Sequence, residues 1–379
     1  MRKKILFRIG SLQGGGAEKS LVTLLKYLDH SKYEIDLLLN CKSGVYLDQL
    51  SREVNLYYIG KGNEFLSRIF ILRFLQKVWR LIRHDFYKFF PHFLYIFKLK
   101  NKGYDVEISF IHTIIPQLIK SPLKSKKVGW IHSDLEANYY DRIRKVILSS
   151  LKRMDIVIAV SKESRDVLLS LSPDLKNKAR IIYNPIEIEK TIRKSRDIII
   201  EKKGKKLQLI TVGRLDIPQK KINRLINVCH RLRQEEIDFK LSILGEGPDR
   251  NKLASQIRTL RLGDIVQLLG YQKNPYPYIQ AADIFVLPSQ AEGMSYVVLE
   301  ALILNKPIIS TDVVGPRELL KNGECGLLVE NSEEGLYQGI KRMLRDQTLR
   351  ISFARKKKDF SSFEPRYIAR QVEEIIDHL

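Results

Sequence analysis

The chain has 379 residues, 44% hydrophobic and 29% charged, which allows two domains with buried cores and excludes a disordered or fibrous chain. Its three cysteines, Cys41, Cys229 and Cys325, stand far apart, which argues against a disulfide framework or a thiolate metal site and fits a reducing cytosol. The formal net charge is +23, and residues 1–180 carry 33 basic against 17 acidic side chains, so we expect an anionic partner or surface.

Short β-branched runs alternate with amphipathic stretches along the first half of the chain. This alternation predicts a parallel sheet covered by helices. The predicted strands of this half are Lys4–Ile9, Glu34–Leu39, Val54–Ile59, Val106–Phe110, Lys127–Ile131, Ile156–Val160 and Arg180–Tyr183.

The basic start, Met1–Lys4, is similar to the first part of a secretory signal, but Arg8 interrupts the apolar run that follows it. We therefore expect a first buried strand there and not a leader. No run of about 18 apolar residues occurs, so no segment is expected to span a bilayer.

The alternation restarts after a charged stretch at residues 187–206. The predicted strands of the second half are Leu207–Val212, Phe239–Leu244, Val266–Leu269, Ile284–Leu287, Ile308–Thr311 and Gly326–Val329. Asn184-Pro185 follows the last strand of the first set, and a residue before proline favours extended backbone, so we place the hinge there. The sequence thus predicts two doubly wound α/β domains, 1–183 and 184–365, with a last helix at 366–379 that packs back on the first.

A glycine-rich loop, Gly14-Gly15-Gly16, follows the first predicted strand and precedes a helix. Ligands of doubly wound sheets bind at the carboxyl ends of the strands, and free amides at a helix start attract anions. The spacing does not fit the GxGxxG fingerprint, and the second strand ends at Asn40 in place of an acid, so NAD or FAD is not expected. A tight turn without a ligand stays open as the alternative.

Two loops of the second domain carry charge or glycine at strand ends. Gly213-Arg214 follows the strand Leu207–Val212, and Lys220 and Lys221 come shortly before the next helix. A guanidinium and an ammonium at one strand end can neutralise a diphosphate, although either side chain could simply be solvated. Gly245 opens a strand-to-helix turn that suits contact with a base or ribose, or is a plain turn.

The most specific stretch runs from Pro288 to Ala301. Glu292 lies in a loop, Gly293 to Ser295 can turn their amides toward a ligand at a helix start, and Glu300 follows on that helix. Two carboxylates beside one crevice can accept hydrogen bonds from the hydroxyls of a sugar or ribose. The alternative is that Glu292 caps the helix and Glu300 faces solvent, but the apolar neighbours of Glu300 argue against a solvated face.

These motifs, in this order, resemble glycosyltransferase family 4. The resemblance spans nearly the whole chain and rests on GGGAEK, VGRL, GEGP, NPYPYIQAADIFVLPS, EGMSYVVLEA and TDVVGPREL, the last three being highly specific. EGMSYVVLEA is similar to the E-x7-E motif of that family. The resemblance implies a GT-B fold, two Rossmann-like domains that face each other across a cleft, and a retaining transfer from a nucleotide sugar.

The resemblance also implies residue roles. Arg214 and Lys220 would hold the donor diphosphate, Glu300 the ribose, and Glu292 the hydroxyls of the donor sugar. His132 matches a histidine near the reacting centre. The predicted catalytic residues are therefore His132, Arg214, Lys220 and Glu292, and the predicted donor-binding residues are Gly15, Gly16, Gly213, Arg214, Lys220, Gly245, Gly293, Met294, Ser295 and Glu300.

Some details stay open at this stage. The loop after Arg214 is one residue longer than is usual in the family, so Lys221 could take the place of Lys220. Met294-Ser295 replaces the usual small aromatic-proline pair, which leaves the sugar unspecified. His132 could also be a plain loop histidine. No Asp-x-Asp motif occurs, so neither a cofactor nor a metal is expected, and positive side chains with helix dipoles would stabilise the leaving group.

Residues 65–102, which we call the aromatic-basic segment, are unusual in composition. They hold nine Lys and Arg against a single acid, Asp85, with eleven Phe, Tyr and Trp side chains between them. Basic and aromatic residues on helices suit the headgroup layer of an anionic membrane. Packing on the first-domain core and nucleic acid binding are the alternatives, the latter disfavoured because no nucleic-acid module is present.

The sequence therefore predicts an enzyme that extends a lipid-linked surface polysaccharide, with a nucleotide sugar, most simply a UDP-sugar, as donor. A polyprenyl-diphosphate-linked glycan would be the acceptor, and the enzyme would lie in the cytoplasm on the inner face of the cell membrane. Nucleotide-sugar epimerases and phosphorylases are alternatives on the same fold, although no pyridoxal lysine is evident. A third alternative is a non-catalytic basic protein that binds membranes.

Overall fold

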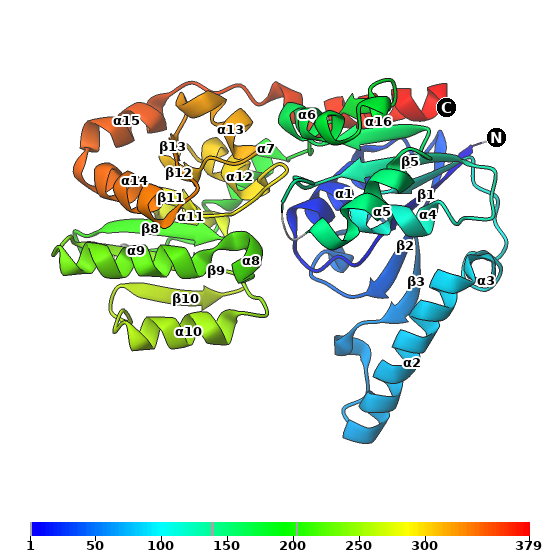
Figure 1. Ribbon diagram of the computed structural model, residues 1–379, viewed down its shortest axis with the longest axis horizontal. Coiled ribbons are helices and arrows are strands. Elements are labelled where there is room, and N and C mark those ends of the chain that lie inside the picture. Colours follow the sequence, from blue (N-terminus) through cyan, green and yellow to red (C-terminus); the bar gives the residue numbers. More distant parts are fainter. Residues whose placement is uncertain (1, 138–139, 202–203) are drawn as a thin grey trace. The chain divides into compact units, whose positions relative to one another are not determined.

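The computed structural model describes residues 2–137, 140–201 and 204–379. The chain forms two compact units. The first unit comprises residues 2–136, Tyr140–Ile186 and Ser361–Leu379, and the second unit comprises Glu187–Phe360 together with Ala137. The sequence predicted the change from the first to the second domain after residue 183 and the return to the first domain at residue 366. Each unit contains one parallel sheet between helices, the doubly wound α/β architecture that the alternating pattern predicted (Figure 1).

The first unit contains a seven-stranded sheet of order β3-β2-β1-β4-β5-β6-β7. Most of its strands contain short apolar runs because both faces are covered, and Ile5, Leu6 and Phe7 of β1 are fully buried. Its strands are β1 Lys3–Ile9, β2 Tyr33–Lys42, β3 Asn55–Lys61, β4 Val106–Ser109, β5 Lys126–Ile131, β6 Ile156–Ala159 and β7 Ala179–Ile181. Its helices apart from residues 65–102 are α1 Gly16–Tyr27, α4 Ile115–Leu118, α5 Asp141–Leu151, α6 Lys162–Leu171 and α16 Pro365–His378.

The C-terminal helix α16 packs on α1 of the first unit. It buries Ile368, Val372 and Ile376, which recur at helical spacing along one face. Polar contacts fix its far end, since Lys3 Nζ donates to the Ile376 carbonyl at 2.6 Å and Tyr33 donates to Asp377 at 2.6 Å. The last helix is therefore part of the first sheet's cover.

The aromatic-basic segment forms two helices between β3 and β4, α2 Phe70–Phe89 and α3 Pro91–Phe97. Its base is packed, because Tyr87, Leu94 and Tyr95 join a cluster with Leu6 and Leu38 of the sheet. Most of its other large apolar side chains are exposed, and Figure 1 shows α2 extending away from the sheet that carries it. Core packing explains the base of this segment and leaves the outer apolar face unexplained.

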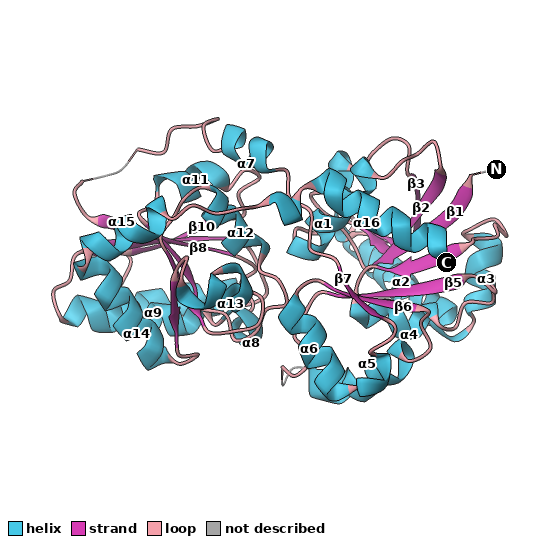
Figure 2. Cartoon of the chain, turned by 90° about the horizontal axis from the view of Figure 1, so that it is seen from above, coloured by secondary structure: helices cyan, strands magenta, loops and turns pink. Residues whose placement is uncertain are grey.

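The second unit contains a six-stranded sheet of order β10-β9-β8-β11-β12-β13. Its strands are β8 Leu207–Val212, β9 Phe239–Leu244, β10 Val266–Gly270, β11 Ile284–Leu287, β12 Ile308–Thr311 and β13 Leu327–Val329. Its helices are α7 Ile188–Lys194, α8 Ile217–Lys220, α9 Ile222–Gln234, α10 Arg250–Thr259, α11 Tyr276–Ala281, α12 Tyr296–Ile303, α13 Pro316–Leu319, α14 Glu333–Arg345 and α15 Gln347–Arg355. Helices α9 and α14 cover one face of the sheet, and α11 and α12 cover the other (Figure 2).

Among the described residues, no helix combines the length and the apolar character needed to cross a membrane.

Candidate functional site

Three neighbouring strands of the second unit bring the predicted donor residues to one edge of the sheet. Strands β9, β8 and β11 are adjacent in that order and parallel. Gly245 follows β9, Gly213 and Arg214 follow β8, and the loop containing Glu292 follows β11. Because carboxyl ends of parallel strands meet at one edge, residues far apart in sequence become neighbours here.

The turn after β8 sets the positions of the basic side chains Arg214 and Lys220. Asp216 caps the short helix α8 by accepting from the Gln219 amide, and its carboxylate also pairs with Arg214 at 3.1 Å. The Arg214 side chain is 63% exposed, so it is available to a ligand. Lys220 ends α8, while Lys221 has a left-handed backbone (φ 50°) at the break before α9.

Glycine is required where the turns after β8 and β9 touch. Gly245 has a φ of +138°, and a Cβ added there would lie 1.9 Å from the Gly213 carbonyl oxygen. The Lys220 side chain lies over Gly213, 3.8 Å from where a Cβ would be. Gly245 therefore allows the two loops to pack closely, whereas a Cβ at Gly213 would make only ordinary contact with the Lys220 side chain.

A buried ion pair joins the β8 and β11 loops. Lys220 Nζ lies 2.5 Å from Glu292 Oε1, and Ser289 Oγ donates to the same oxygen at 2.6 Å. The two charged side chains are only 18% and 8% exposed. The structure thus pairs Lys220 with Glu292, and the carboxylate binds a cation from a different loop in place of serving only as a helix cap.

The start of α12 is tightly enclosed. Ser295 is its N-cap residue, 2% exposed, and its Oγ is buried without a hydrogen-bond partner. Gly315 has a φ of +81°, and a Cβ there would meet the Gly293 carbonyl oxygen at 2.0 Å. Met294 is also buried, at 7% exposure. A helix start with an unused hydroxyl suits an anionic or polyhydroxyl ligand.

Glu300 lies inside α12, at 3% exposure, so the solvent-facing alternative is wrong. Tyr276 of α11 donates its hydroxyl to Glu300 Oε1 at 3.1 Å. Burial, and then the charge of Glu300, raise the pKa of the Tyr276 phenol well above its usual value, which keeps it a donor. The tyrosine therefore fixes one carboxylate oxygen of Glu300.

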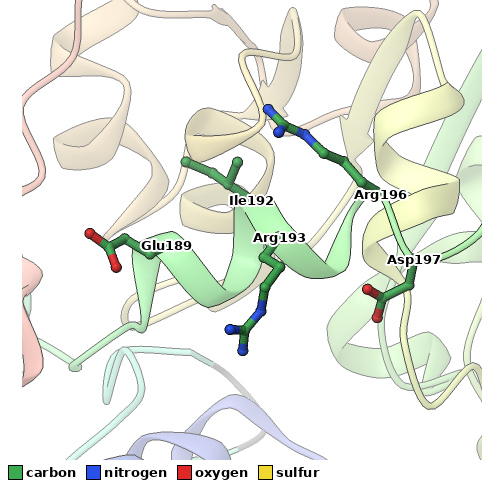
Figure 3. Close-up of a pocket in the computed structure, with 5 residues that line it drawn as sticks. All are labelled: Glu189, Ile192, Arg193, Arg196 and Asp197. Atoms are coloured by element: carbon green, nitrogen blue, oxygen red, sulfur yellow. The ribbon is translucent and has the colours of Figure 1, made fainter.

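A hollow of about 450 Å³ lies along α7, which packs on α11 and α12. It is lined by Glu189, Ile192, Arg193, Arg196 and Asp197 (Figure 3). None of the predicted site residues lines it. Its charged side chains are exposed on one helix and the turn that follows, so we do not place the donor there.

His132 follows β5 in the first unit. Its ring packs on Phe110 with 4.9 Å between centroids, and its Nε2 is buried without a partner, unlike a solvated loop histidine. Burial, reinforced by nearby His112, lowers the pKa of His132 to about 3. His112 Nε2 contacts the Tyr140 hydroxyl at 2.8 Å, and burial lowers its pKa to about 4. Both imidazoles are therefore neutral at physiological pH.

We expect unfolding free energy to fall as the pH drops from 6.5 to 5. In this window the unfolded chain binds protons at His112 and His132 while the folded chain does not, so stability rises with pH, by up to about 1.4 kcal/mol per pH unit for each histidine. Urea titrations across this range measure the slope. The slope should be smaller in His132→Phe, and an identical slope in this variant would contradict the buried neutral histidine.

The glycine loop of the first unit begins helix α1, with Gly15 as its N-cap and Gly16 as its first residue. A Cβ at Gly15 would lie 2.2 Å from Glu18 Oε2. The Glu18 carboxylate thus folds over the loop, where it would compete with an anion unless it moves.

Several site residues were not identified from the sequence. They are Gln219, Arg224, Tyr276, Ser289, Thr311 and Asn331, which hold the backbone or carboxylates of the site. Ser289 could have been predicted as a partner of Glu292, because it lies only three residues before it in the same loop. The others are recognisable only once the strands are assembled. Within the described ranges, no group of three or more His, Cys, Asp or Glu side chains is arranged to hold a metal ion.

The comparisons with known proteins agree with this geometry. Residues 193–360 match the family described as Glycosyl transferases group 1, and residues 14–190 match Glycosyltransferase Family 4. The chain is 31% identical to the N-acetylgalactosamine-N,N'-diacetylbacillosaminyl-diphospho-undecaprenol 4-alpha-N-acetylgalactosaminyltransferase of Campylobacter jejuni, over 98% of both chains. It is 24% identical to the N-acetyl-alpha-D-glucosaminyl L-malate synthase of Bacillus anthracis, over 72% of this chain and 74% of that one.

Solved structures give the same fold. The structure of HepE from Anabaena in complex with UDP and glucose superposes with a TM-score of 0.72 at 18% identity, over 100% of both chains. The fold and the family matches together cover both units. The chain therefore belongs to glycosyltransferase family 4, with the GT-B fold of two Rossmann-like domains, and it is a glycosyltransferase that acts in glycan synthesis.

Proposed function

We propose that the chain is a retaining transferase that moves a sugar from a UDP-sugar to a lipid-linked glycan. The observation that carries this proposal is the pair of buried carboxylates at one sheet edge. Glu292 is paired with Lys220 through one oxygen, and Glu300 is bonded to Tyr276. A carboxylate can accept about four hydrogen bonds, so each side chain has the capacity to accept from ligand hydroxyls, and a lysine and an arginine lie at the strand end for a diphosphate.

In this proposal, the donor is held in three parts. Glu300 accepts from the ribose hydroxyls, Arg214 and Lys220 face the diphosphate, and Glu292 accepts from the sugar hydroxyls beside the amides of Gly293–Ser295. Positive charge at the diphosphate stabilises the departing UDP, and the start of α12 adds its dipole, so the reaction would need no metal or other cofactor. For His132 we keep the role implied by the family, a contact near the reacting carbon.

Retention and a UDP donor are supported by names and titles of similar proteins. The Campylobacter and Bacillus relatives are named for alpha-linked sugar products, and the HepE structure holds UDP. If the donor sugar is alpha-linked to UDP, an alpha-linked product means that the acceptor attacks from the face that UDP leaves. An N-acetylhexosamine is the sugar that both relatives' names specify.

A lipid-linked acceptor accounts for the aromatic-basic segment. The Campylobacter relative acts, by its name, on a diphospho-undecaprenol-linked glycan. Side chains of α2 such as Phe70, Trp79 and Phe89 are 62 to 83% exposed, and the segment is strongly basic. Aromatic side chains beside lysine and arginine suit an anionic headgroup layer, where such an acceptor would lie. We therefore propose a cytoplasmic enzyme, peripheral on the inner face of the cell membrane.

Incubation of the protein with UDP-N-acetylhexosamines tests the reaction. UDP release that requires a polyprenyl-diphosphate-linked acceptor, with an alpha-linked product, is the expected result. Interconversion of the donor without acceptor would indicate an epimerase, and neither reaction with any UDP-sugar would leave a binding protein. Either of these two outcomes contradicts the proposed function.

We expect the double variant Arg73→Ser, Lys88→Ser to bind acidic vesicles more weakly. Both side chains are exposed on α2, and each basic residue near an anionic surface contributes about 1 kcal/mol, so the loss should be roughly 30-fold. Co-sedimentation with vesicles of neutral and acidic lipid measures it. The matched control is Lys205→Ser, Arg258→Ser, which removes two exposed charges from the second unit.

If the control variant loses as much affinity for acidic vesicles, the effect reflects net charge alone and not the position of the charges on α2. Equal binding of the wild type to neutral and acidic vesicles would contradict the electrostatic contribution. Binding to nucleic acid that exceeds binding to vesicles would favour the nucleic-acid alternative.

A further inference from the structure

The loop that carries Glu292 is held by an unusual number of side chains. It follows the end of β11, where the sheet no longer supplies ladder partners to its carbonyl groups. Each of the four carbonyls from 288 to 291 nonetheless accepts a hydrogen bond from a side chain. The donors, in order, are Arg224 to Pro288, Thr311 to Ser289, Asn331 to Gln290 and Gln219 to Ala291.

Arg224 and Asn331 form the centre of this support. Arg224 Nη2 donates to the Pro288 carbonyl at 2.7 Å and to Asn331 Oδ1 at 2.9 Å, and its Nη1 donates to the Asn331 carbonyl at 3.1 Å. Asn331 Nδ2 then donates to the Gln290 carbonyl at 3.0 Å. One guanidinium and one amide thus hold two alternate carbonyls of the loop from α9 and from the turn before α14.

This arrangement is costly for stability alone. Arg224 is 9% exposed, and burial lowers the pKa of its guanidinium. Its described hydrogen bonds go to carbonyl and amide oxygens, and its Nε is buried without a partner. The Glu333 carboxylate offsets only part of the cost of desolvating this charge, so the buried guanidinium and its unmet Nε–H cost free energy that an apolar side chain between two helices would avoid. Such a cost indicates a role in placing the loop.

We propose that Arg224 and Asn331 are positioning residues that act through Glu292. They fix the backbone of residues 288–290, which sets where Ser289 and Glu292 meet. The inference rests on the proposed function, since it concerns the carboxylate assigned to the donor sugar. Because neither side chain faces the ribose residue Glu300, the pair sets turnover and leaves nucleotide affinity unchanged.

The test compares Arg224→Met with Arg231→Met. Arg231 lies on the same helix and also bridges to α14, where it pairs with Glu334 at 2.8 Å and stacks on Tyr337, away from the Glu292 loop. We expect a ~10- to 100-fold lower kcat in Arg224→Met, the loss typical of a small misplacement of a reacting group. UDP affinity by calorimetry should match the wild type, and Arg231→Met should keep its kcat.

Asn331→Asp covers the case in which Arg224→Met does not fold. It keeps the acceptor for Arg224 and removes the donor to Gln290, so its kcat should fall although its melting temperature should not. In a Glu292→Gln background, either change should have almost no further effect on kcat. Full additivity, or wild-type kcat in both single variants, would overturn the proposal.

Hydrogen exchange separates this inference from the proposed function. Amides of residues 289–293 should exchange faster in Arg224→Met than in Arg231→Met, whatever reaction the enzyme performs. If the wild type transfers no sugar but this difference is present, the proposed function fails and the support of the loop stands. If the wild type transfers sugar and the exchange rates are the same, only the positioning role fails.

Discussion

Glu300→Ala should bind UDP ~10- to 100-fold more weakly than the wild type, since hydrogen bonds to a charged acceptor contribute about 1.5–3 kcal/mol. Glu300 is buried, and Tyr276 holds one of its oxygens, so the other is oriented before a ligand arrives. Such preorganisation lowers the entropy cost of binding. Calorimetry with UDP and with UMP measures the loss, which should be similar for both because both contain the ribose.

Tyr276→Phe is the matched control for Glu300→Ala. It removes the hydroxyl that donates to Glu300 and keeps the ring, so UDP affinity should fall less than in Glu300→Ala. Thermal unfolding of both variants shows whether the fold is intact. Unchanged UDP affinity in folded Glu300→Ala would show that the ribose assignment is wrong.

Glu292→Gln should lower kcat by ~10²–10³-fold, the effect typical of losing one preorganised electrostatic contact in the transition state. Glutamine has the same shape but cannot neutralise Lys220, which lies 2.5 Å away. UDP affinity should not fall, because UDP lacks the sugar that Glu292 is proposed to contact and Lys220, no longer paired with a carboxylate, still faces the diphosphate. Steady-state kinetics with a saturating UDP-sugar separate kcat from KM.

Ser289→Ala serves as the control for this variant. Ser289 donates to the same Glu292 oxygen as Lys220, so its loss should weaken the orientation of the carboxylate without removing its charge. We expect an intermediate kcat. A wild-type kcat in Glu292→Gln would contradict a catalytic role for this carboxylate.

The fold could be predicted from the sequence because its signal is local. Each predicted strand overlaps an observed one, since a parallel strand buried on both faces is a short continuous apolar run. Glu292 and Glu300 were also recognisable, as acidic residues in apolar surroundings after a strand. The Lys220–Glu292 pair was not, because 72 residues separate its members and only the order β8-β11 brings them together.

Tyr276, Arg224 and Asn331 could not have been identified from local patterns. Tyr276 lies in an aromatic stretch that is typical of a buried helix, and its hydroxyl acquires a role only through its contact with Glu300 on α12. Arg224 lies among residues of an amphipathic helix, where an arginine normally faces solvent. Its burial follows from the approach of the 288–290 loop and of Asn331, 107 residues away.

The way α16 completes the first unit has a consequence for synthesis on the ribosome. Residues 187–360, which make up nearly all of the second unit, form one continuous stretch that can fold as soon as it has emerged. The first unit lacks the helix that covers α1 until residues 361–379 follow. Although it is made first, it is completed last, and until then its apolar surface along α1 is open to chaperones and to other nascent chains.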